Sequence, residues 1–437
     1  MSLKMRYAAR VLGLLVLVAG AGTAMGAASV PLPPVVIIPG LCGSQMEARL
    51  TEAYDSAPHW YCPRGSKNSV WKRVWFSLKD YVVPSCVDHE MQVRVAEGPD
   101  GSLRYSNIEG VEIRPVDFGG VGGIGCLDPQ FCGISSYFNP LIKALETRAG
   151  YVVNETLFGA PYDFRLAGDG LVQDGFEANL TALIEGAVAK NGNRTVTLIG
   201  HSMGGMVATY FLAGKPADWI ERHVGGLMTI SSPYGGSPLA LQGSISGASI
   251  GLPIMVHAFL GIQDNSPSGP WLYPSQGLWN ASVPMVRTRN KSYPPTAKGF
   301  ADLLQDLGRR EQSIILPRVR NMRGIDFDAE GGPSYPSFPN LRHVCFHGNK
   351  RNTPGQLTYP VDNFYEGDSP PSPLVTSYVD GDGIVDIKSL KACENVQGMN
   401  TEVIAIEGEE HVQILHSEEL ARQVLAFLVG DHDRQTH

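Results

Sequence analysis

The segment VTLIGHSMGG at residues 196–205 decides the fold of this chain. It opens with a short apolar run, typical of a strand buried on both faces of a parallel sheet, and a helical pattern begins directly after Ser202. A G-x-S-x-G pentapeptide between a strand and a helix predicts a sharp turn that exposes the serine at the end of the sheet. Because the pentapeptide also occurs by chance in glycine-rich chains, predicting Ser202 as a nucleophile depends on finding an acid and a base downstream.

Predicted strands and helices alternate on both sides of this segment. The strands are expected at residues 35–38, 151–158, 195–199, 224–230, 343–346, 374–379 and 402–406, and the helices at 137–148, 176–189, 203–213 and 417–428. This alternation predicts an α/β fold of the α/β-hydrolase type, with a mainly parallel sheet flanked by helices. Residues 44–135 and 237–323 break the alternation with turn residues, so we predict that they are excursions from the core.

A nucleophilic serine needs a base to take its proton and an acid to orient that base, and in this fold they follow in the order serine, acid, histidine. Asp382 lies in the turn DGDG at 380–383, which comes directly after the apolar run at 374–379, so that its carboxylate would face the site. His411 follows the last predicted strand through a short loop, which is the position of the base. The position favours His411 over His416, which lies in or near the closing helix.

The acidic turn allows two other interpretations. Asp380 and Asp386 remain alternatives to Asp382 as the acid. A calcium loop would need a third oxygen ligand, a glycine and a glutamate where the chain has Ile384, Val385 and Lys391, so that reading fails.

Acyl transfer also needs two N–H donors for the oxyanion, one from the residue after the nucleophile and one from the loop after an early strand. Met203 is predicted to supply the first donor and Leu41 the second. Cys42, beside Leu41, is either a small buried apolar residue or a thiol whose modification blocks the site. This chemistry requires no metal ion and no organic cofactor, and no Cys/His set has the spacing of a zinc site.

The N-terminus predicts export. Basic residues up to Arg10 precede an apolar run at residues 11–18 and small residues at 24–28, which is the order of a secretory signal peptide. The run is well short of the roughly 20 residues that a spanning helix needs. We therefore predict a signal peptide at residues 1–26, a hydrolase domain at 27–437 and a secreted or lysosomal location. Five glycosylation sequons agree with export, at Asn154, Asn179, Asn193, Asn280 and Asn290.

Seven cysteines in an exported chain predict disulfides with one thiol left over. They bracket three segments and leave one residue, as Cys62 and Cys86, Cys126 and Cys132, Cys345 and Cys393, and Cys42. The net charge of −8 and the pI near 5.8 provide no broad basic surface, so nucleic acid is excluded as a partner.

Seven motifs together resemble the lecithin:cholesterol acyltransferase family, most closely its lysosomal phospholipase A and transacylase branch. They are VVIIPGLCGSQMEARL at 35–50, SSYFNPLIKALE at 135–146, GAPYDFR at 159–165, GHSMGG at 200–205, SSPYGGSP at 231–238, DGDGIV at 380–385 and EHVQILHSEE at 410–419. The resemblance covers most of the mature chain. It implies a phospholipase or O-acyltransferase that cleaves a phospholipid acyl ester through an acyl-serine and passes the acyl group to water or a lipid alcohol.

The resemblance also assigns residues. It implies the triad Ser202, Asp382 and His411, the oxyanion donors Leu41 and Met203, and the disulfides Cys62–Cys86 and Cys345–Cys393. Asp163 falls on a family motif near the site, where it is expected to order the pocket. Two departures stand out, because Ile384 replaces a common threonine and the loop holding Cys126 and Cys132 looks like an insertion.

Two segments resemble the lipid-handling parts of the family, which implies a peripheral contact with a membrane or lipoprotein surface. The excursion at about 55–90 resembles a membrane-binding subdomain, with amphipathic residues Trp71, Lys72, Arg73, Trp75, Phe76, Leu78 and Lys79. The insertion at about 235–325 resembles a cap and lid, with apolar residues Ile254, Met255, Val256, Phe259 and Leu260. The alternatives are a phosphatidylcholine–sterol acyltransferase proper, a neutral-glyceride lipase, or a non-catalytic lipid-binding protein.

Overall fold

The computed structural model describes residues 32–79, 84–248, 260–364 and 372–435. The predicted signal peptide lies outside these residues, as do the predicted lid residues Ile254, Met255, Val256 and Phe259. Among the described helices, none combines the length and the apolar character needed to cross a bilayer.

A six-stranded sheet forms the centre of the fold, and all of its strand pairs are parallel. In spatial order the strands are β17 (Asn400–Glu407), β14 (Arg342–Asn349), β9 (Val224–Ile230), β8 (Val196–His201), β1 (Val35–Ile38) and β7 (Leu157–Gly159). Every residue of β1 and β8 is buried, so both faces of the sheet are covered. The predicted parallel α/β fold is therefore confirmed.

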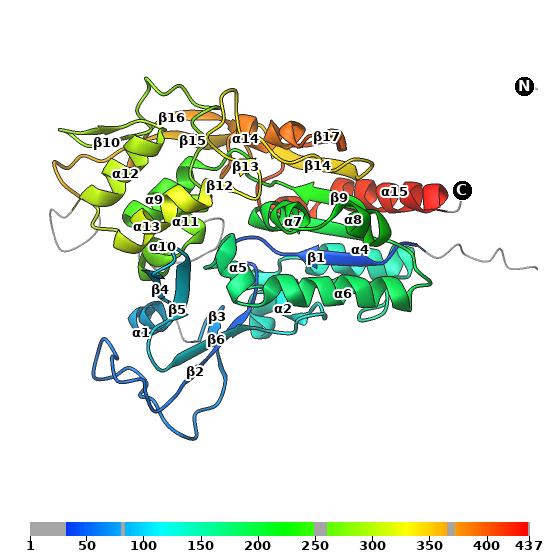
Figure 1. The fold of residues 1–437 in the computed structure, drawn as a ribbon, viewed down its shortest axis with the longest axis horizontal. Coiled ribbons are helices and arrows are strands. Elements are labelled where there is room, and N and C mark those ends of the chain that lie inside the picture. Colours follow the sequence, from blue (N-terminus) through cyan, green and yellow to red (C-terminus); the bar gives the residue numbers. More distant parts are fainter. Residues whose placement is uncertain (1–31, 80–83, 249–259, 365–371, 436–437) are drawn as a thin grey trace, which may run out of the picture. The chain divides into compact units, whose positions relative to one another are not determined.

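Helices lie along this sheet (Figure 1). The main ones are α4 (Asn139–Ala149), α6 (Phe176–Lys190), α7 (Met203–Ala213), α8 (Ala217–His223) and α15 (Glu418–Gln435). α7 packs on β1, β8 and β9, while α4 contacts α15 and α6 contacts α8. Because β1 and β8 pair with Ile38 opposite Gly200, the loop after β1 leaves the sheet beside the turn after β8.

The first excursion contains more regular structure than its sequence indicates. It forms an antiparallel sheet of β3 (Lys72–Trp75), β2 (Met46–Leu50) and β6 (Val111–Pro115), a hairpin of β4 (Val93–Glu97) and β5 (Leu103–Asn107), and α1 (Pro84–Glu90). These strands are at most five residues long and separated by turn residues, so no sustained period marks them in the sequence.

The second excursion has a hydrophobic core of its own, which includes Leu241, Tyr273, Phe300 and Leu304. Its elements are α9 (Pro238–Ser246), α10 (Leu260–Asn265), α11 (Ser268–Trp271), β10 (Val286–Arg287), β11 (Ser292–Tyr293), α12 (Ala297–Asp306), α13 (Arg310–Val319), β12 (Asn321–Met322) and β13 (Ile325–Asp326). Figure 1 shows α9, α10, α12 and α13 to the left of the central sheet.

One strand predicted for the central sheet instead belongs to a separate sheet, together with β10 and β11 of the second excursion. The run at 374–379 forms β16 (Leu374–Gly381), which pairs antiparallel with β15 (Arg351–Thr358) in a sheet ordered β11-β10-β15-β16. Assigning it to the central sheet was wrong, because its residues alternate between exposed and half-buried instead of being buried on both faces. Its carboxyl end still leads directly to Asp382.

A buried histidine in β14 gives the fold a specific acid sensitivity. His343 lies between the hydroxyls of Thr229 and Thr401, with its Nε2 2.9 Å and its Nδ1 3.1 Å from them, and burial lowers its pKa from 6.5 to about 3. Since only the unfolded chain binds the proton between these values, stability is lost as the pH falls below 6.5.

We expect His343→Gln to reduce this loss. Between pH 7 and pH 5, the free energy of unfolding of the wild type should fall by about 2 kcal/mol more than that of the variant. Urea denaturation at the two pH values measures this difference, and the fixed cost of the substitution cancels because each protein is compared with itself. Equal losses in both proteins would show that His343 is not held neutral.

Candidate active site

The turn between β8 and α7 has the geometry of a nucleophile elbow. Ser202 adopts φ 53° and ψ −128°, a backbone conformation that residues other than glycine rarely take. Its N–H donates to the carbonyl of Ile230 at 2.8 Å. A Cβ on Gly204 would lie 2.3 Å from the carbonyl oxygen of Ile38, and one on Gly200 would lie 2.6 Å from the backbone of Gly205. The glycines of GHSMGG are therefore required for close packing.

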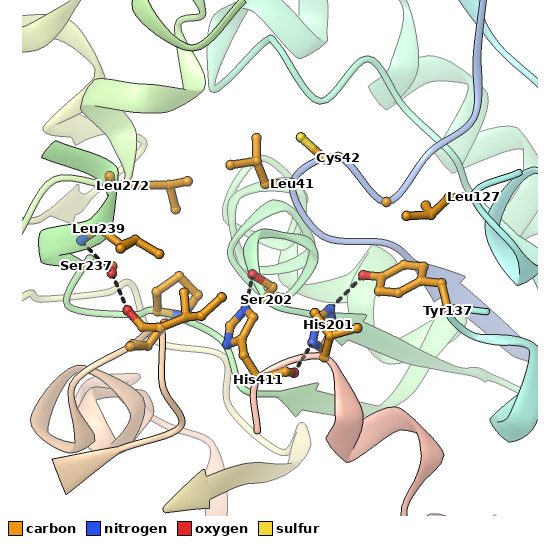
Figure 2. Close-up of a pocket in the computed structure, with 16 residues that line it drawn as sticks. Leu41, Cys42, Leu127, Tyr137, His201, Ser202, Ser237, Leu239, Leu272 and His411 are labelled. Atoms are coloured by element: carbon orange, nitrogen blue, oxygen red, sulfur yellow. Dashed lines mark hydrogen bonds between the residues drawn. The ribbon is translucent and has the colours of Figure 1, made fainter. Parts of the chain in front are cut away.

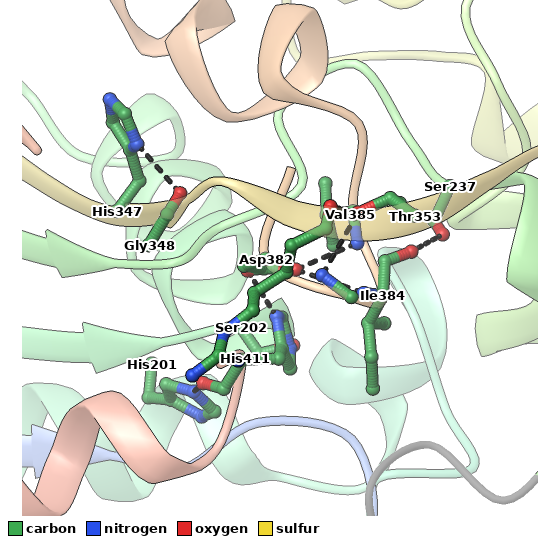
Figure 3. Close-up of polar contacts among 12 residues, drawn as sticks. His201, Ser202, Ser237, His347, Gly348, Thr353, Asp382, Ile384, Val385 and His411 are labelled. Carbon is green, nitrogen blue, oxygen red and sulfur yellow. Dashed lines mark hydrogen bonds and ion pairs between the residues drawn. The ribbon is translucent and has the colours of Figure 1, made fainter. Parts of the chain in front are cut away.

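The structure brings Ser202, His411 and Asp382 together in one line of hydrogen bonds (Figure 3). The Oγ of Ser202 lies 2.9 Å from Nε2 of His411, and Nδ1 of His411 lies 2.7 Å from Oδ2 of Asp382. The backbone N–H of His411 also donates to the carbonyl of Asp382 at 2.9 Å. His411 can therefore take a proton from Ser202 while Asp382 orients its ring.

The carboxylate of Asp382 is buried and fully engaged. Its Oδ1 accepts the N–H groups of Ile384 at 3.1 Å and Val385 at 2.8 Å, which leaves Oδ2 for His411. These backbone donors stabilise a negative charge that would otherwise be costly to bury.

The alternative residues have other partners or positions. Asp380 accepts the N–H of Lys350 at 2.6 Å, and Asp386 caps the N-terminus of α14 (Ile387–Lys391). His416 is exposed at the end of a short 3₁₀ turn. Of these acids and bases, only Asp382 and His411 form the line of contacts to Ser202.

A second hydrogen-bond chain, which the sequence did not predict, links the two loops around the nucleophile (Figure 2). Nε2 of His201 lies 2.8 Å from the carbonyl of His411, so it carries the proton and donates. Nδ1 of His201 must then accept from the hydroxyl of Tyr137, at 2.6 Å. That hydroxyl accepts the N–H of Gly40 at 2.9 Å.

This second hydrogen-bond chain requires a neutral His201. Burial, together with the neighbouring His411, lowers the pKa of His201 to about 3, so the ring keeps one donor and one acceptor in use. Tyr137 and His201 both lie in motifs quoted above, SSYFNPLIKALE and GHSMGG. Nothing in either motif indicates that the two side chains meet. These hydrogen bonds connect the loop of His411 to the loop of Gly40 through His201, the residue before Ser202.

Tyr137→Phe should therefore weaken catalysis only by changing the positions of the loops that carry Gly40 and His411. The buried N–H of Gly40 and Nδ1 of His201 lose their partner, and we expect kcat on a soluble ester to fall roughly tenfold to a hundredfold with little change in KM. Steady-state kinetics measures the effect. Tyr162→Phe is the matched control, because no hydrogen-bond partner is found for the buried Tyr162 hydroxyl in the described part of the chain. Equal losses in both variants would contradict a positioning role.

The predicted oxyanion donors are Met203, which follows Ser202 in the chain, and Leu41, which lies in a loop that passes close to Ser202. Met203 is the first residue of α7, so its N–H has no acceptor within the helix and points from a positive helix end. A Cβ on Gly40 would lie 2.8 Å from Cβ of Ser202, which shows how closely the loop that carries Leu41 passes the nucleophile. Leu41 lines the same cavity as Ser202.

The cavity over Ser202 is mainly apolar and has an empty volume of about 660 Å³. Leu41, Leu239 and Leu272 line it (Figure 2). Ile384, at the position where the resemblance leads us to expect threonine, lines it as well. A second apolar cavity of about 610 Å³ shares five residues with the first, which are Leu41, Cys42, Leu239, Ala240 and Leu272. The two spaces together form an extended apolar surface that begins at the serine.

The cysteines follow the predicted pattern. The structure joins Cys62 to Cys86, Cys126 to Cys132 and Cys345 to Cys393. Cys42 has no disulfide partner among the described residues, lines both cavities, and accepts the indole N–H of Trp75 on its carbonyl at 2.8 Å. Burial raises the pKa of the Cys42 thiol, so it remains neutral and poorly nucleophilic.

Two further groups of predicted residues are visible. Asp163 forms a buried ion pair with Arg165, whose guanidinium also donates to the carbonyl of Met91 at 2.9 Å, while the intervening Phe164 lines the second cavity. All five sequon asparagines are exposed, namely Asn154, Asn179, Asn193, Asn280 and Asn290.

Comparison with known proteins identifies the family. Residues 67–306 match the family model described as lecithin:cholesterol acyltransferase. Lecithin-cholesterol acyltransferase-like 1 of Arabidopsis thaliana is 29% identical over 90% of this chain and 88% of its own length.

Two human relatives represent two branches. Phosphatidylcholine-sterol acyltransferase is 29% identical over 91% of this chain and 85% of its own length. Lysosomal phospholipase A and acyltransferase is 26% identical over 91% of both chains. The family model covers more than half of the sequence, and the chain belongs to the lecithin:cholesterol acyltransferase family.

Proposed function

We propose that the protein is a serine-dependent phospholipase and O-acyltransferase that removes a fatty acyl group from a glycerophospholipid and transfers it to water or a lipid alcohol. The observation that carries this proposal is the hydrogen-bonded line of Ser202, His411 and Asp382 at the mouth of the apolar cavities. The family of the chain supports a lipid acyl ester as the substrate.

In the first half-reaction Nε2 of His411 takes the proton of Ser202, and Oγ attacks the ester carbonyl. The carbonyl oxygen becomes an oxyanion that accepts the N–H groups of Leu41 and Met203. When the tetrahedral species collapses, the protonated His411 gives its proton to the departing glycerol oxygen. A lysophospholipid leaves, and the acyl group remains on Ser202 as an ester.

In the second half-reaction His411 takes a proton from the acceptor hydroxyl, whose oxygen attacks the acyl-serine carbonyl. Collapse of this second tetrahedral species returns the proton from His411 to Oγ of Ser202. Water as the acceptor yields a free fatty acid, and a sterol or a ceramide yields a lipid ester. The imidazolium formed in each step is stabilised by the carboxylate of Asp382, which is held ready by two backbone donors.

The apolar lining favours a long acyl chain. The first cavity places Leu41, Leu239 and Leu272 next to the serine, and the second continues past Trp75 and Phe164. Burying an acyl chain there contributes about 0.8 kcal/mol per methylene group, so short and long esters would differ strongly in affinity. We assign the segment at about 235–325 the role of a cap and lid over this surface.

We place the protein in the secretory pathway, secreted or lysosomal. The N-terminal sequence, the exposed sequons and the three disulfides support this location. Expression with the native N-terminus followed by N-glycosidase treatment tests it, and a chain that keeps residues 1–26 and carries no glycan would contradict it.

Product analysis on liposomes tests the activity. Phosphatidylcholine vesicles containing a sterol or a ceramide are incubated with the protein, and the lipids are identified by mass spectrometry. Lysophospholipid together with sterol ester, acylceramide or free fatty acid is the expected result, and the ratio identifies the acceptor. If neutral glycerides alone are cleaved, the protein is a lipase. If no ester is cleaved and a fluorophosphonate does not label Ser202, it is a non-catalytic lipid-binding protein.

A further inference from the structure

The loop at residues 126–136, here called the disulfide loop, begins and ends beside the catalytic cavity. Leu127, near its start, and Tyr137, directly after its end, both line that cavity (Figure 2). Cys126 and Ser136 pair as an antiparallel bridge, and the N–H of Leu127 donates to the carbonyl of Ser135 at 2.8 Å. The residues between these ends therefore lie beside the cavity that Ser202 lines.

The tip of the disulfide loop exposes large apolar side chains. Phe131 is 41% exposed and Ile134 is 68% exposed. The sequence from Pro129 to Ile142 contains no Asp, Glu, Lys, Arg or His, so the apolar tip has no charged neighbours along the chain. Exposed apolar residues that gather at one place mark an interaction site more often than scattered ones do.

Hydrogen bonds of Asp128 and Ser135 fix the base of the disulfide loop. Asp128 is buried, and its carboxylate accepts the N–H groups of Gln130 at 3.0 Å and Leu78 at 2.9 Å. The hydroxyl of Ser135 accepts the N–H of Asp128 at 3.0 Å and donates to its carbonyl at 2.8 Å. With the disulfide Cys126–Cys132, these contacts fix the loop before any partner arrives, so binding loses little conformational entropy.

Asp128 also connects the loop to the first excursion. Leu78 follows β3, and Arg73 within β3 lies 4.0 Å from the carboxylate of Asp128. Trp60, Tyr61 and Val70, which precede β3, are also exposed. The disulfide loop is therefore a second site of exposed apolar side chains. The buried carboxylate of Asp128 connects it to the segment that resembles a membrane-binding subdomain.

We propose that the disulfide loop inserts Phe131 and Ile134 into the lipid surface that supplies the substrate. An apolar tip without charged side chains suits a neutral phospholipid interface. Insertion at the cavity rim would bring the ester bond of a phospholipid toward Ser202 without full extraction of the lipid. The inference rests on the proposed function for its substrate, but not for the contact itself.

Vesicle binding tests the contact without turnover. Phe131→Ser/Ile134→Ser is compared with Val152→Ser/Val429→Ser, which removes two apolar side chains of similar exposure, 49% and 52%, away from the cavity lining. Both double variants are made in the full-length protein carrying Ser202→Ala, and flotation with phosphatidylcholine vesicles measures partition. The loop variant should bind about tenfold more weakly or worse, at low salt and at high salt, and the control should bind like its parent.

Activity with an intact Ser202 separates the remaining outcomes. The loop variant should lose about tenfold in turnover of vesicle phospholipid and keep its rate on a short soluble ester. Equal loss on both substrates would mean that the loop supports the catalytic fold. Lipoprotein particles are assayed as a third substrate, and a loss of turnover on these particles alone would indicate a protein partner. Either result overturns the assignment. If the wild type binds vesicles through the loop but deacylates nothing, the proposed function fails while the lipid contact stands.

Discussion

Replacing Ser202 with alanine is expected to lower the rate of phospholipid cleavage roughly 10⁵-fold to 10⁶-fold and to leave the fold intact. The substitution removes the hydroxyl that lies 2.9 Å from Nε2 of His411, while the backbone turn and the glycine contacts around it remain. The rate of lysophospholipid release from vesicles measures the loss, and thermal unfolding checks that stability is retained.

Ser231→Ala is the matched control for this experiment. Ser231 follows β9, adopts a positive φ of 49°, and has a buried hydroxyl for which no hydrogen-bond partner is found among the residues that the structure describes. It therefore has the local features of a strained serine without the contact to His411. Near-normal activity is expected. Comparable losses in both variants would mean that the strained turns, and not the hydroxyl of Ser202, carry the activity.

The second large effect is expected from Asp382→Asn, which should lower kcat by roughly 10³-fold to 10⁴-fold. An amide donates to Nδ1 of His411 and so favours the tautomer with its proton on Nε2, which cannot accept the proton of Ser202. Because the side chain keeps its size, the loss should appear in kcat more than in KM. Steady-state kinetics on vesicles and on a soluble ester measures both constants.

Asp380→Asn separates this role from a general effect of the acidic turn. Asp380 lies two residues earlier, and its carboxylate accepts the N–H of Lys350, the residue after β14. We expect its substitution to change kcat by no more than about threefold, as for an exposed hydrogen bond. A larger loss from Asp380→Asn than from Asp382→Asn would assign the acid to Asp380.

The central sheet could be predicted because its signals are local. Strands such as β1 and β8 are continuous apolar runs, and GHSMGG needs no distant partner to be recognised. The order of serine, acid and histidine along the chain then predicted Asp382 and His411, and the structure brings both to Ser202. Whether these residues perform catalysis remains a prediction.

Other features depend on pairings that no local pattern reveals. β16 has the composition of a core strand, but β15, which was not predicted, pairs with it in the second sheet. The link from Tyr137 to His201 spans 64 residues of sequence, and the link from His201 to His411 spans 210. Similarly, the strands of the first excursion are too short to show a period.

The acyl-serine is the claim on which the account depends most directly. The protein is incubated with phosphatidylcholine, quenched in acid after a short time, digested, and analysed by peptide mass spectrometry. The account predicts a fatty acyl group on Ser202 in the wild type and none in the Ser202→Ala protein. An acyl group on another residue, or rapid product formation with Ser202 unmodified at every time point, would contradict it.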